Sequence, residues 1–356
     1  ERTKRIMAYT TINNGSLFMN PKIYTGNGSA GNSITGVNFQ PDFTWIKDRD
    51  NTRNHVLTDA VRGVTKNIFS NTDGTESTDT STLTAFNSDG FTLGNGTKVN
   101  GNSINFASWN WKANGAGSSN TNGSITSTVS VNTTSGFSIV KWSGTAANAT
   151  IGHGLGSVPK MIIIKNISDA YYWVVYHQAT GNTAYTRLNT TDASSSSLNM
   201  FQNYTPTDDV FYVSSQGYVN GGGGNQMIAY CFADVQGFSK MGSYVGNGSA
   251  DGTFVYTGFK PAFVMCKASS VGGSVGYAWS MFDNKRSSYN IERSQLEANT
   301  SDAQQTDASG DIDLLSNGFK FRSSASENNQ SGATYIYMAF AEAPLVGTNN
   351  IPANAR

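Results

Sequence analysis

Histidine is the side chain best suited to move protons near neutral pH, and the chain contains three of them, His55, His153 and His177. His153 stands in a glycine-rich turn, which favours a structural role. A repeat in the chain aligns His177 with Asp59 and Asp283. A position held by one histidine and two aspartates is more typical of a polar strand end that bonds a nearby loop than of a catalytic base.

The sequence offers no clear constellation for nucleophilic or carboxylate catalysis. No nucleophile elbow of the Gly-x-Ser-x-Gly type stands between an expected strand and an expected helix. Glycosidases need two carboxylates about 5 to 9.5 Å apart. The available pairs lie in stretches typical of solvated loops: Asp311 with Asp313, or two of Asp73, Glu76 and Asp79. We therefore predict no catalytic residues and no enzymatic activity. A polysaccharide depolymerase stays open as an alternative, and it would need two carboxylates in a cleft of one repeat only.

Glycine-rich and acidic segments do not indicate a cofactor or a metal. Gly246-Asn247-Gly248 resembles part of a dinucleotide fingerprint but opens no helix, and the four glycines at 221–224 precede an expected strand, so both are interpreted as turns. The loop at 48–50 lacks regularly spaced calcium ligands. Cys231 and Cys266 lie in apolar runs, where buried thiols are expected. Two such cysteines fit a protein folded in a reducing compartment.

Recognition of a surface or a glycan is harder to exclude, because sugar rings stack on exposed aromatic side chains with polar neighbours. The loop after one recurring strand varies most in character: it contains Asp48, Arg49 and Asp50 in one copy and Tyr171 and Tyr172 in another. Adjacent residues of an extended segment point to opposite faces, so one tyrosine of the pair is expected to face solvent. We take these five residues as candidate ligand contacts.

Composition indicates an all-β chain. Lys+Arg and Asp+Glu are 24 each, and charged residues make up 13% where about 25% is usual. This disfavours nucleic acid as a partner, because binding it needs concentrated cations. Aromatic residues reach 12% and can fill sizeable cores, while the abundant Gly, Ser, Thr and Asn are poor helix formers. The longest aliphatic run, at 161–164, is far too short to cross a membrane, and no secretory signal precedes Ala8.

A threefold repeat organises the chain. An aromatic residue is followed 17 residues later by a proline in all three copies: Tyr24 to Pro41, Trp142 to Pro159 and Tyr244 to Pro261. An apolar strand follows each proline and ends in lysine, at Lys47, Lys165 and Lys267. A phenylalanine and a second aromatic close each copy at intervals of 20, 21 and 21 residues: Phe91 to Trp111, Phe211 to Phe232 and Phe319 to Phe340. These equal intervals predict equivalent buried rings.

The predicted organisation is three tandem antiparallel β-sandwich repeats, of jelly-roll or lectin-like type, of about 100 residues each. They cover 18–113, 136–234 and 235–343, with an N-terminal arm at 1–17 and a C-terminal tail at 344–356. Residues 114–135 are almost wholly Gly, Ser, Thr and Asn and are expected to form a flexible linker. Repeats 2 and 3 are then expected to pack rigidly, with repeat 1 on a hinge.

Three segments resemble a recurrent β-sandwich domain of tailed-phage virion proteins, notably those of marine phages and cyanophages: Tyr24-Thr25-Gly26-Asn27-Gly28, 36–47 and Asn87-Ser88-Asp89-Gly90-Phe91. The resemblance is clearest in repeats 1 and 3. It implies a tail-fibre or surface-appendage subunit in the virion, assembled in the host cytoplasm. It also implies contacts with other virion proteins, a homo-oligomer such as a trimer, and attachment to a host-surface glycan. The alternatives are the depolymerase and a cellular lectin or adhesin.

Overall fold

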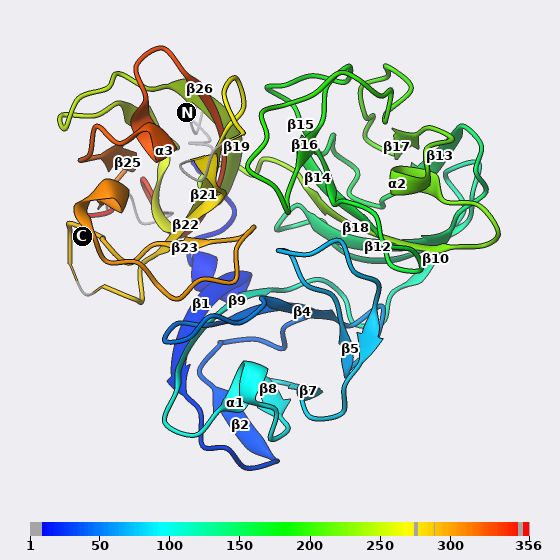
Figure 1. The fold of residues 1–356 in the computed structure, drawn as a ribbon, viewed down its shortest axis with the longest axis horizontal. Helices are drawn as coiled ribbons and strands as arrows, with labels where there is room; N and C mark the ends of the chain where they lie inside the picture. Colours follow the sequence, from blue (N-terminus) through cyan, green and yellow to red (C-terminus); the bar gives the residue numbers. More distant parts are fainter. Residues whose placement is uncertain (1–8, 274–276, 288, 348–351, 356) are drawn as a thin grey trace, which may run out of the picture.

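The computed structural model describes residues 9–273, 277–287, 289–347 and 352–355. It is 41% strand and 6% helix, so the predicted all-β class is confirmed. Three lobes surround a common centre, coloured blue to cyan, green, and yellow to red (Figure 1). They are numbered lobe 1, lobe 2 and lobe 3 in chain order. Among the described residues, no helix is both long enough and apolar enough to span a bilayer.

Lobe 1 contains two antiparallel sheets that face each other. The larger has the order β1 (Met19–Thr25), β9 (Asn105–Trp111), β3 (Phe43–Asp48), β4 (Val56–Asp59), and the smaller has the order β2 (Asn32–Thr35), β8 (Gly90–Leu93), β7 (Leu83–Asn87). Strands β5 (Lys66–Asn67) and β6 (Ser77–Thr78) pair separately. Rings and aliphatic side chains of both sheets, Phe91 and Phe106 among them, form one buried cluster.

Lobe 2 is built around a seven-stranded sheet. Its order is β10 (Ser118–Asn120), β11 (Ser127–Asn132), β12 (Phe137–Ser143), β18 (Gln226–Phe232), β14 (Met161–Asn166), β15 (Val174–His177), β16 (Thr186–Arg187). A two-stranded sheet, β13 (Ala149–Gly152) with β17 (Val210–Val213), covers part of it. Residues of both sheets, including Trp142 and Phe211, share one core.

Lobe 3 repeats the arrangement with a five-stranded and a three-stranded sheet. The larger has the order β19 (Ser239–Val245), β26 (Thr334–Pro344), β21 (Phe259–Ala268), β22 (Ser280–Asp283), β23 (Leu296–Glu297). The smaller has the order β20 (Phe254–Tyr256), β25 (Gly318–Phe321), β24 (Ile312–Leu315). One four-residue helix precedes the last long strand of each lobe: α1 (Thr97–Asn100), α2 (Gly217–Asn220) and α3 (Ser326–Asn329).

The same four strands recur in the larger sheet of every lobe. The order β1-β9-β3-β4 of lobe 1 corresponds to β12-β18-β14-β15 and to β19-β26-β21-β22. The landmark phenylalanines Phe91, Phe211 and Phe319 are all buried, as the equal intervals predict. Cys231 and Cys266 are buried free thiols, which confirms that expectation.

Two glycine-rich segments form turns, as predicted. Gly248 follows β19 and has a φ of 67°, in the left-handed region that favours glycine. The N–H of Asn247 in the same turn donates to the Asn329 side chain at 2.9 Å. In the tetraglycine, Gly223 and Gly224 also have positive φ values, of 64° and 80°. Neither segment opens a helix that could hold a nucleotide phosphate.

The segment 114–135 is not a flexible linker. It contains β10 and β11, and β11 pairs along its whole length with β12, from Ser127 opposite Trp142 to Asn132 opposite Phe137. Val129 is buried in the lobe 2 core. The segment also bonds lobe 1, because Asp42 accepts the N–H of Gly115 at 3.0 Å, beside the N–H of Ala113 at 2.7 Å within lobe 1. Ser and Thr suit strands near a sheet edge, so polar composition alone was a misleading sign of flexibility.

Aromatic rings from all three lobes meet at the centre of the molecule. Trp111 and Phe232 end β9 and β18, Phe340 holds the equivalent position within the longer β26, and each ring contacts the other two. The centroid distances are 6.3 Å for Trp111 to Phe232, 5.8 Å for Trp111 to Phe340 and 5.8 Å for Phe232 to Phe340. These rings belong to one cluster that runs through all three lobes. The expected hinge between repeats 1 and 2 is therefore wrong, because lobe 1 shares this core.

A ring of polar contacts closes around that centre. Trp173 of lobe 2 donates from Nε1 to the carbonyl of Phe69 in lobe 1 at 3.0 Å, and Trp279 of lobe 3 donates to the carbonyl of Arg187 in lobe 2 at 2.9 Å. In lobe 1 the equivalent residue is His55, whose Nε2 lies 2.9 Å from the carbonyl of Glu297 in lobe 3. Each lobe thus bonds its neighbour through the residue that immediately precedes β4, β15 or β22, and the cycle returns to its start.

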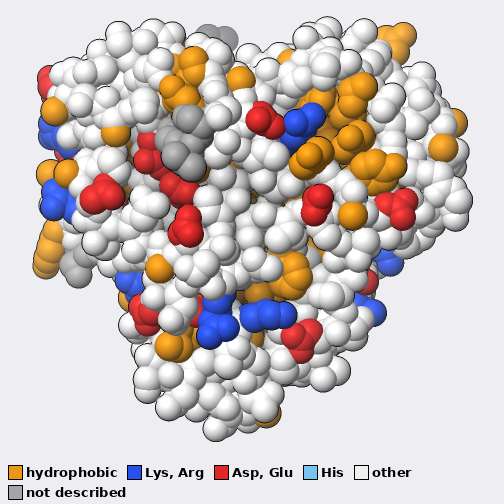
Figure 2. Space-filling model, in the orientation of Figure 1, with side chains coloured by type: hydrophobic (Ala, Val, Ile, Leu, Met, Phe, Trp, Pro, Cys, Tyr) orange, Lys and Arg blue, Asp and Glu red, His pale blue; other side chains and the backbone are white. Residues whose placement is uncertain are grey.

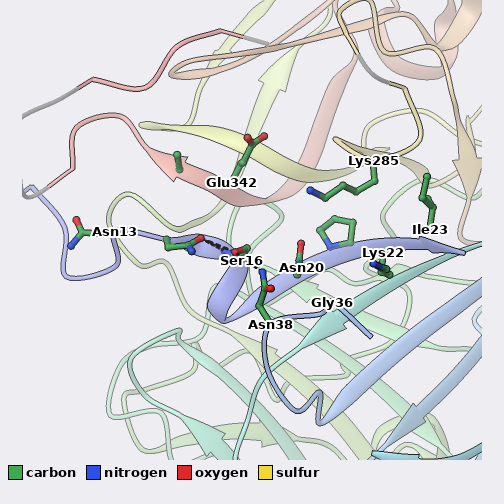
Figure 3. A pocket seen from close by; sticks show the side chains of 12 residues that line it. Asn13, Ser16, Asn20, Lys22, Ile23, Gly36, Asn38, Lys285 and Glu342 are labelled. Carbon is green, nitrogen blue, oxygen red and sulfur yellow. Dashed lines mark hydrogen bonds between the residues drawn. The ribbon is translucent and has the colours of Figure 1, made fainter. Parts of the chain in front are cut away.

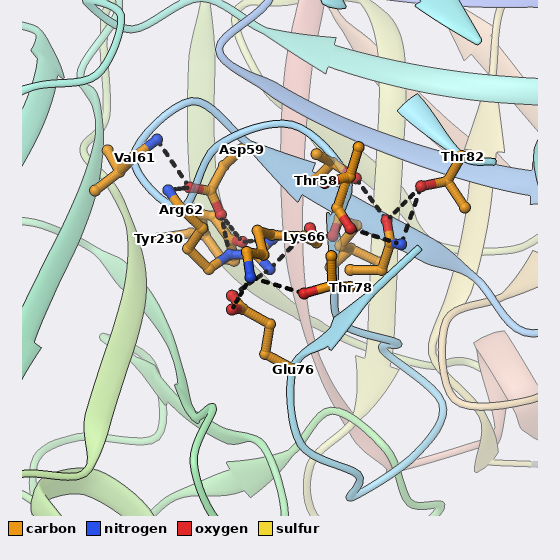
Figure 4. Close-up of polar contacts among 12 residues, drawn as sticks. Thr58, Asp59, Val61, Arg62, Lys66, Glu76, Thr78, Thr82 and Tyr230 are labelled. Carbon is orange, nitrogen blue, oxygen red and sulfur yellow. Dashed lines mark hydrogen bonds and ion pairs between the residues drawn. The ribbon is translucent and has the colours of Figure 1, made fainter. Parts of the chain in front are cut away.

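A second cycle uses the aligned residues Asp59, His177 and Asp283. Asp59 caps the following turn and accepts Arg62 Nε at 2.5 Å and the Tyr230 hydroxyl of lobe 2 at 2.8 Å (Figure 4). Asp283 accepts the Trp109 indole of lobe 1 at 3.0 Å, and His177 Nε2 lies 3.1 Å from the carbonyl of Tyr337 in lobe 3. All three also accept N–H groups of the turn that follows, so the predicted strand-end role is confirmed. Their contacts between lobes were not predicted.

The described part of the N-terminal arm packs on lobe 3. The Tyr9 hydroxyl donates to the carbonyl of Gly258 at 2.7 Å, and Ile12 is buried in the central cluster. A single 3-10 turn, η1 (Gly15–Leu17), leads into β1. Beyond β26, the N–H of Leu345 also bonds the carbonyl of Gly258. The described part of the arm and the residue after β26 therefore both bond the same carbonyl of lobe 3.

Candidate functional site: a tyrosine and arginine surface

The loop at 48–50 is used for structure more than for recognition. Asp48 is buried, and its carboxylate accepts the N–H groups of Asp50 and Asn51, both at 2.9 Å. The expected ligand contact is therefore wrong for Asp48, because its oxygens hold the loop. Arg49 is half-buried and donates from Nε to Gln304 of lobe 3 at 2.8 Å. Asp50 is exposed and accepts the N–H of Asn105 at 2.7 Å.

Tyr171 and Tyr172 lie on the surface of lobe 2 and contact one common ring. Tyr218, on α2, has its centroid 4.7 Å from that of Tyr171 and 6.2 Å from that of Tyr172, with the latter two planes only 4° apart. The side chains therefore do not point to opposite faces as expected, because the segment before β15 is not an extended strand. Tyr172 is 36% exposed, so one tyrosine of the pair does face solvent.

Arg187 supplies a cation beside the exposed ring. It ends β16, and its guanidinium lies 4.7 Å from the centroid of Tyr172, within the range of a cation–π contact. Its Nη1 donates to Asp192 at 3.0 Å, with both side chains partly exposed. Tyr171, Tyr172, Tyr218 and Arg187 together are called the tyrosine–arginine surface. Figure 2 shows hydrophobic side chains gathered beside a cationic one on the face of this lobe.

A buried lysine fixes the backbone under this surface. Lys165 is the next-to-last residue of the recurring strand β14, and its Nζ donates to the carbonyls of Asn166 at 2.6 Å, Tyr171 at 2.9 Å and Asp73 of lobe 1 at 3.0 Å. Burial lowers the pKa of Lys165 to about 8. The Tyr171 ring covers Gly217, where a Cβ atom would lie 2.7 Å from the ring. The rings are thus held in place before any ligand arrives.

The equivalent positions in the other lobes carry different chemistry. In lobe 1 the pair corresponding to Arg187 and Tyr218 is Phe69 and Lys98, with the ammonium 5.4 Å from the ring centroid. In lobe 3 the pair is Glu297 and Glu327, two buried carboxyl groups joined by a hydrogen bond. Burial, and after it the neighbouring Glu327 carboxyl, together raise the pKa of Glu297 to about 8.

Of the four residues in the surface, sequence reasoning found the two tyrosines of the loop and missed Tyr218 and Arg187. The sequence signal for Tyr218 and Arg187 is weak, because the stretches that contain these two residues vary most between the three repeats. The position of each pair is nevertheless recoverable from topology: Arg187 and Glu297 both end the strand beside β15 or β22, and Tyr218 and Glu327 are both second in the short helix.

The remaining candidate groups are occupied. His153 is buried, its Nδ1 accepts the N–H of Leu155 at 3.2 Å and burial lowers its pKa, consistent with the structural role expected. Asp311 pairs with Arg293 at 2.7 Å and Asp313 with Arg322 at 2.5 Å. In the part of the chain that the structure describes, no group of three or more His, Cys, Asp or Glu side chains could hold a metal ion.

The tyrosine–arginine surface can bind but lacks reactive groups. A flat, partly exposed ring offers an apolar face, and the adjacent guanidinium and phenol hydroxyls offer hydrogen bonds. Rings of this kind give large contact area at low entropy cost. Such an arrangement suits a ligand with both C–H faces and hydroxyl groups.

Comparison with known proteins identifies a family. No curated protein matches the sequence. One family model matches residues 14–344, which spans all three lobes, and its description is a domain of unknown function, DUF7483. Because this match covers most of the chain, the protein belongs to the DUF7483 family.

Proposed function

We propose that the protein is a structural component of a tailed-phage virion, a tail-fibre or surface-appendage subunit that attaches to a host-surface glycan. The resemblance of its motifs to virion domains supports the location in the particle. The all-β architecture suits assembly and adhesion. Other virion proteins, and further copies of this chain, are the partners that follow from this role.

We interpret the recurring strand order as three tandem β-sandwich repeats that have become one closed body. The corresponding sheets, the equivalent buried phenylalanines and the two cycles of contacts between lobes support this interpretation. A fibre protein benefits from such a body because mechanical load is spread over three interfaces. The interpretation also explains how one position became a binding surface in lobe 2 only.

The observation that carries glycan attachment is the Tyr172 ring, which is 36% exposed and contacts both Tyr218 and Arg187. The equivalent positions lack tyrosine hydroxyls beside a cation: Lys98 lies over Phe69 in lobe 1, and Glu297 pairs with Glu327 in lobe 3. The surface therefore differs from its counterparts in the features that a sugar ring needs.

Binding is favoured over cleavage. The depolymerase alternative needs two carboxylates in a cleft of a single lobe, and Glu297 with Glu327 does occur in lobe 3 alone. Those two groups are hydrogen-bonded to each other and buried. A glycosidic bond has to fit between catalytic carboxylates about 5 to 9.5 Å apart, and no such space separates this pair.

Adsorption of the purified protein to host cells and to extracted host polysaccharide tests the proposal. Tyr172→Ala and Arg187→Ala should each reduce binding by about fivefold to 150-fold, since each removes a contact of roughly 1 to 3 kcal/mol. Lys98→Ala changes the equivalent position of lobe 1 and is the matched control, so it should bind normally. Equal binding by all variants would remove the surface from consideration, and absence of the protein from purified particles by mass spectrometry would refute the virion role.

A further inference from the structure

A groove of about 560 Å³ lies between lobes 1 and 3, away from the tyrosine–arginine surface. The residues that line it come from the N-terminal arm, from β1 and the turn after β2, and from the ends of β22 and β26. Lys285 and Glu342 face Asn20, Lys22 and Asn38 across the opening (Figure 3). Its volume is within the range of small-molecule sites.

The groove exists because β1 is left open. In lobe 2 the equivalent strand β12 is covered by β11, whereas β1 is the last strand of its sheet. Pro21 has no N–H group, and proline in a strand is typical of such edges because it discourages pairing with another strand. A small ligand therefore fits this place better than an added peptide strand.

Lys22 and Lys285 place two ammonium groups in the lining of the groove. Among the described residues, neither Lys22 nor Lys285 forms a salt bridge within 4 Å. Lys22 is half-buried, and its Nζ lies close against Gly36, where a Cβ atom would be 2.9 Å away. The N–H groups of Gly36 at 2.9 Å and Asn38 at 2.6 Å donate to Asp89 and lower its pKa, and the charge of Lys22 lowers that pKa as well.

Among the described residues that line the groove, the carboxylate is Glu342, and it is already paired with a cation. Glu342 Oε1 lies 3.2 Å from the ammonium of Lys260, and Oε2 accepts the Asn284 amide at 2.7 Å. Both oxygens are thus used by residues outside the groove. The charge of Lys22 and Lys285 remains available to a bound anion.

The rest of the lining offers amides, a hydroxyl and a small apolar wall. Asn38 donates to the Ser16 hydroxyl at 3.1 Å, and that hydroxyl donates to Asn14 at 2.7 Å. Side-chain amides present donors and acceptors together, which matches the hydroxyl groups of a sugar. Pro21 and Ile23, the latter 39% exposed, supply C–H surface for one face of a ring.

We propose that this groove binds a saccharide unit that bears a carboxylate, with Lys22 and Lys285 pairing with the carboxylate and the amides bonding the ring hydroxyls. The site shares no residue with the tyrosine–arginine surface, so this proposal can be tested independently of the attachment proposed above.

Titration calorimetry with digalacturonate tests the groove, with its methyl ester as the probe that keeps the ring and removes the charge. The free acid should bind, and the ester, Lys22→Gln and Lys285→Gln should each weaken binding about tenfold or more, as the loss of a charged hydrogen bond does. Lys160→Gln, on lobe 2, is the control and should bind normally. Unaltered thermal melting would show that the variants fold, and Arg187→Ala should bind digalacturonate as the native protein does.

Three results would overturn the proposal: no binding of digalacturonate at millimolar concentration, equal binding of acid and ester, or unchanged binding by both lysine variants. Binding by the groove with no adsorption to host cells would leave this site standing while refuting the proposed attachment. Adsorption to host cells without binding of digalacturonate would refute the groove proposal alone.

Discussion

Replacing Glu297 by Gln should change how stability depends on pH. The folded protein raises the pKa of Glu297 from 4.5 to about 8, first through burial and then through Glu327. A raised pKa means that the folded state holds the proton more tightly than the unfolded chain does. This contribution is complete below pH 4.5 and is lost as the pH rises through 8. At 1.36 kcal/mol per pKa unit, the shift corresponds to a loss of roughly 5 kcal/mol across that window.

Glutamine is close to isosteric with the protonated acid, and its amide can donate to Glu327 in place of the shared proton. The Glu297→Gln protein should therefore match the native protein near pH 4.5 and exceed it by several kcal/mol at pH 8 and above. Urea unfolding followed by tryptophan fluorescence, at intervals from pH 4.5 to 9, measures the difference. Asp208→Asn, at an exposed carboxylate of lobe 2, is the control and should follow the native curve. Parallel curves for Glu297→Gln and the native protein would refute the shared proton.

Three further predictions concern the core, the buried amine of Lys165 and the segment 118–132. Phe232→Ala should cost about 3 to 5 kcal/mol, and calorimetry should show separate transitions because the ring joins lobes; Phe91→Ala, within lobe 1, should cost as much without splitting the transition. The pKa of Lys165 falls from 10.5 to about 8, so the folded state binds fewer protons than the unfolded chain between these values and stability rises with pH there. Lys165→Met should remove about 3 kcal/mol of that rise in urea unfolding. Limited proteolysis should spare 118–132, since β10 and β11 are paired, and early cleavage there would contradict the sheet assignment.

The equal intervals in the sequence predicted much of the fold. They identified Phe91, Phe211 and Phe319 as buried because a core ring and the turn beside it tolerate little change in spacing. The same intervals pointed to Trp111, Phe232 and Phe340 as equivalent. That these three rings touch one another did not follow, because a repeat alignment says which residues correspond and not which surfaces meet.

The contacts between lobes could not be predicted from the sequence, for a physical reason. The indoles of Trp173 and Trp279 bond backbone carbonyls of other lobes, and every residue carries a carbonyl, so no residue type marks the acceptor. The polar composition of the segment containing β11 led to a wrong prediction of flexibility, since Ser and Thr are common both in loops and in strands near a sheet edge. At the candidate site, the aromatic types of Tyr171 and Tyr172 were informative, while the partners Tyr218 and Arg187 depended on how distant elements meet.

The closed cycle of lobes has a consequence for biosynthesis. His55 finds its acceptor on Glu297, 242 positions further along the chain. Contacts of such high sequence separation slow folding, because loop entropy is lost before they form. We expect lobe 1 to remain incompletely packed while the chain is being synthesised. Its central tryptophan side chains should stay exposed to solvent until most of lobe 3 has left the ribosome. A nascent chain halted before that point would be prone to aggregation, and coexpressed chaperones should raise its soluble yield.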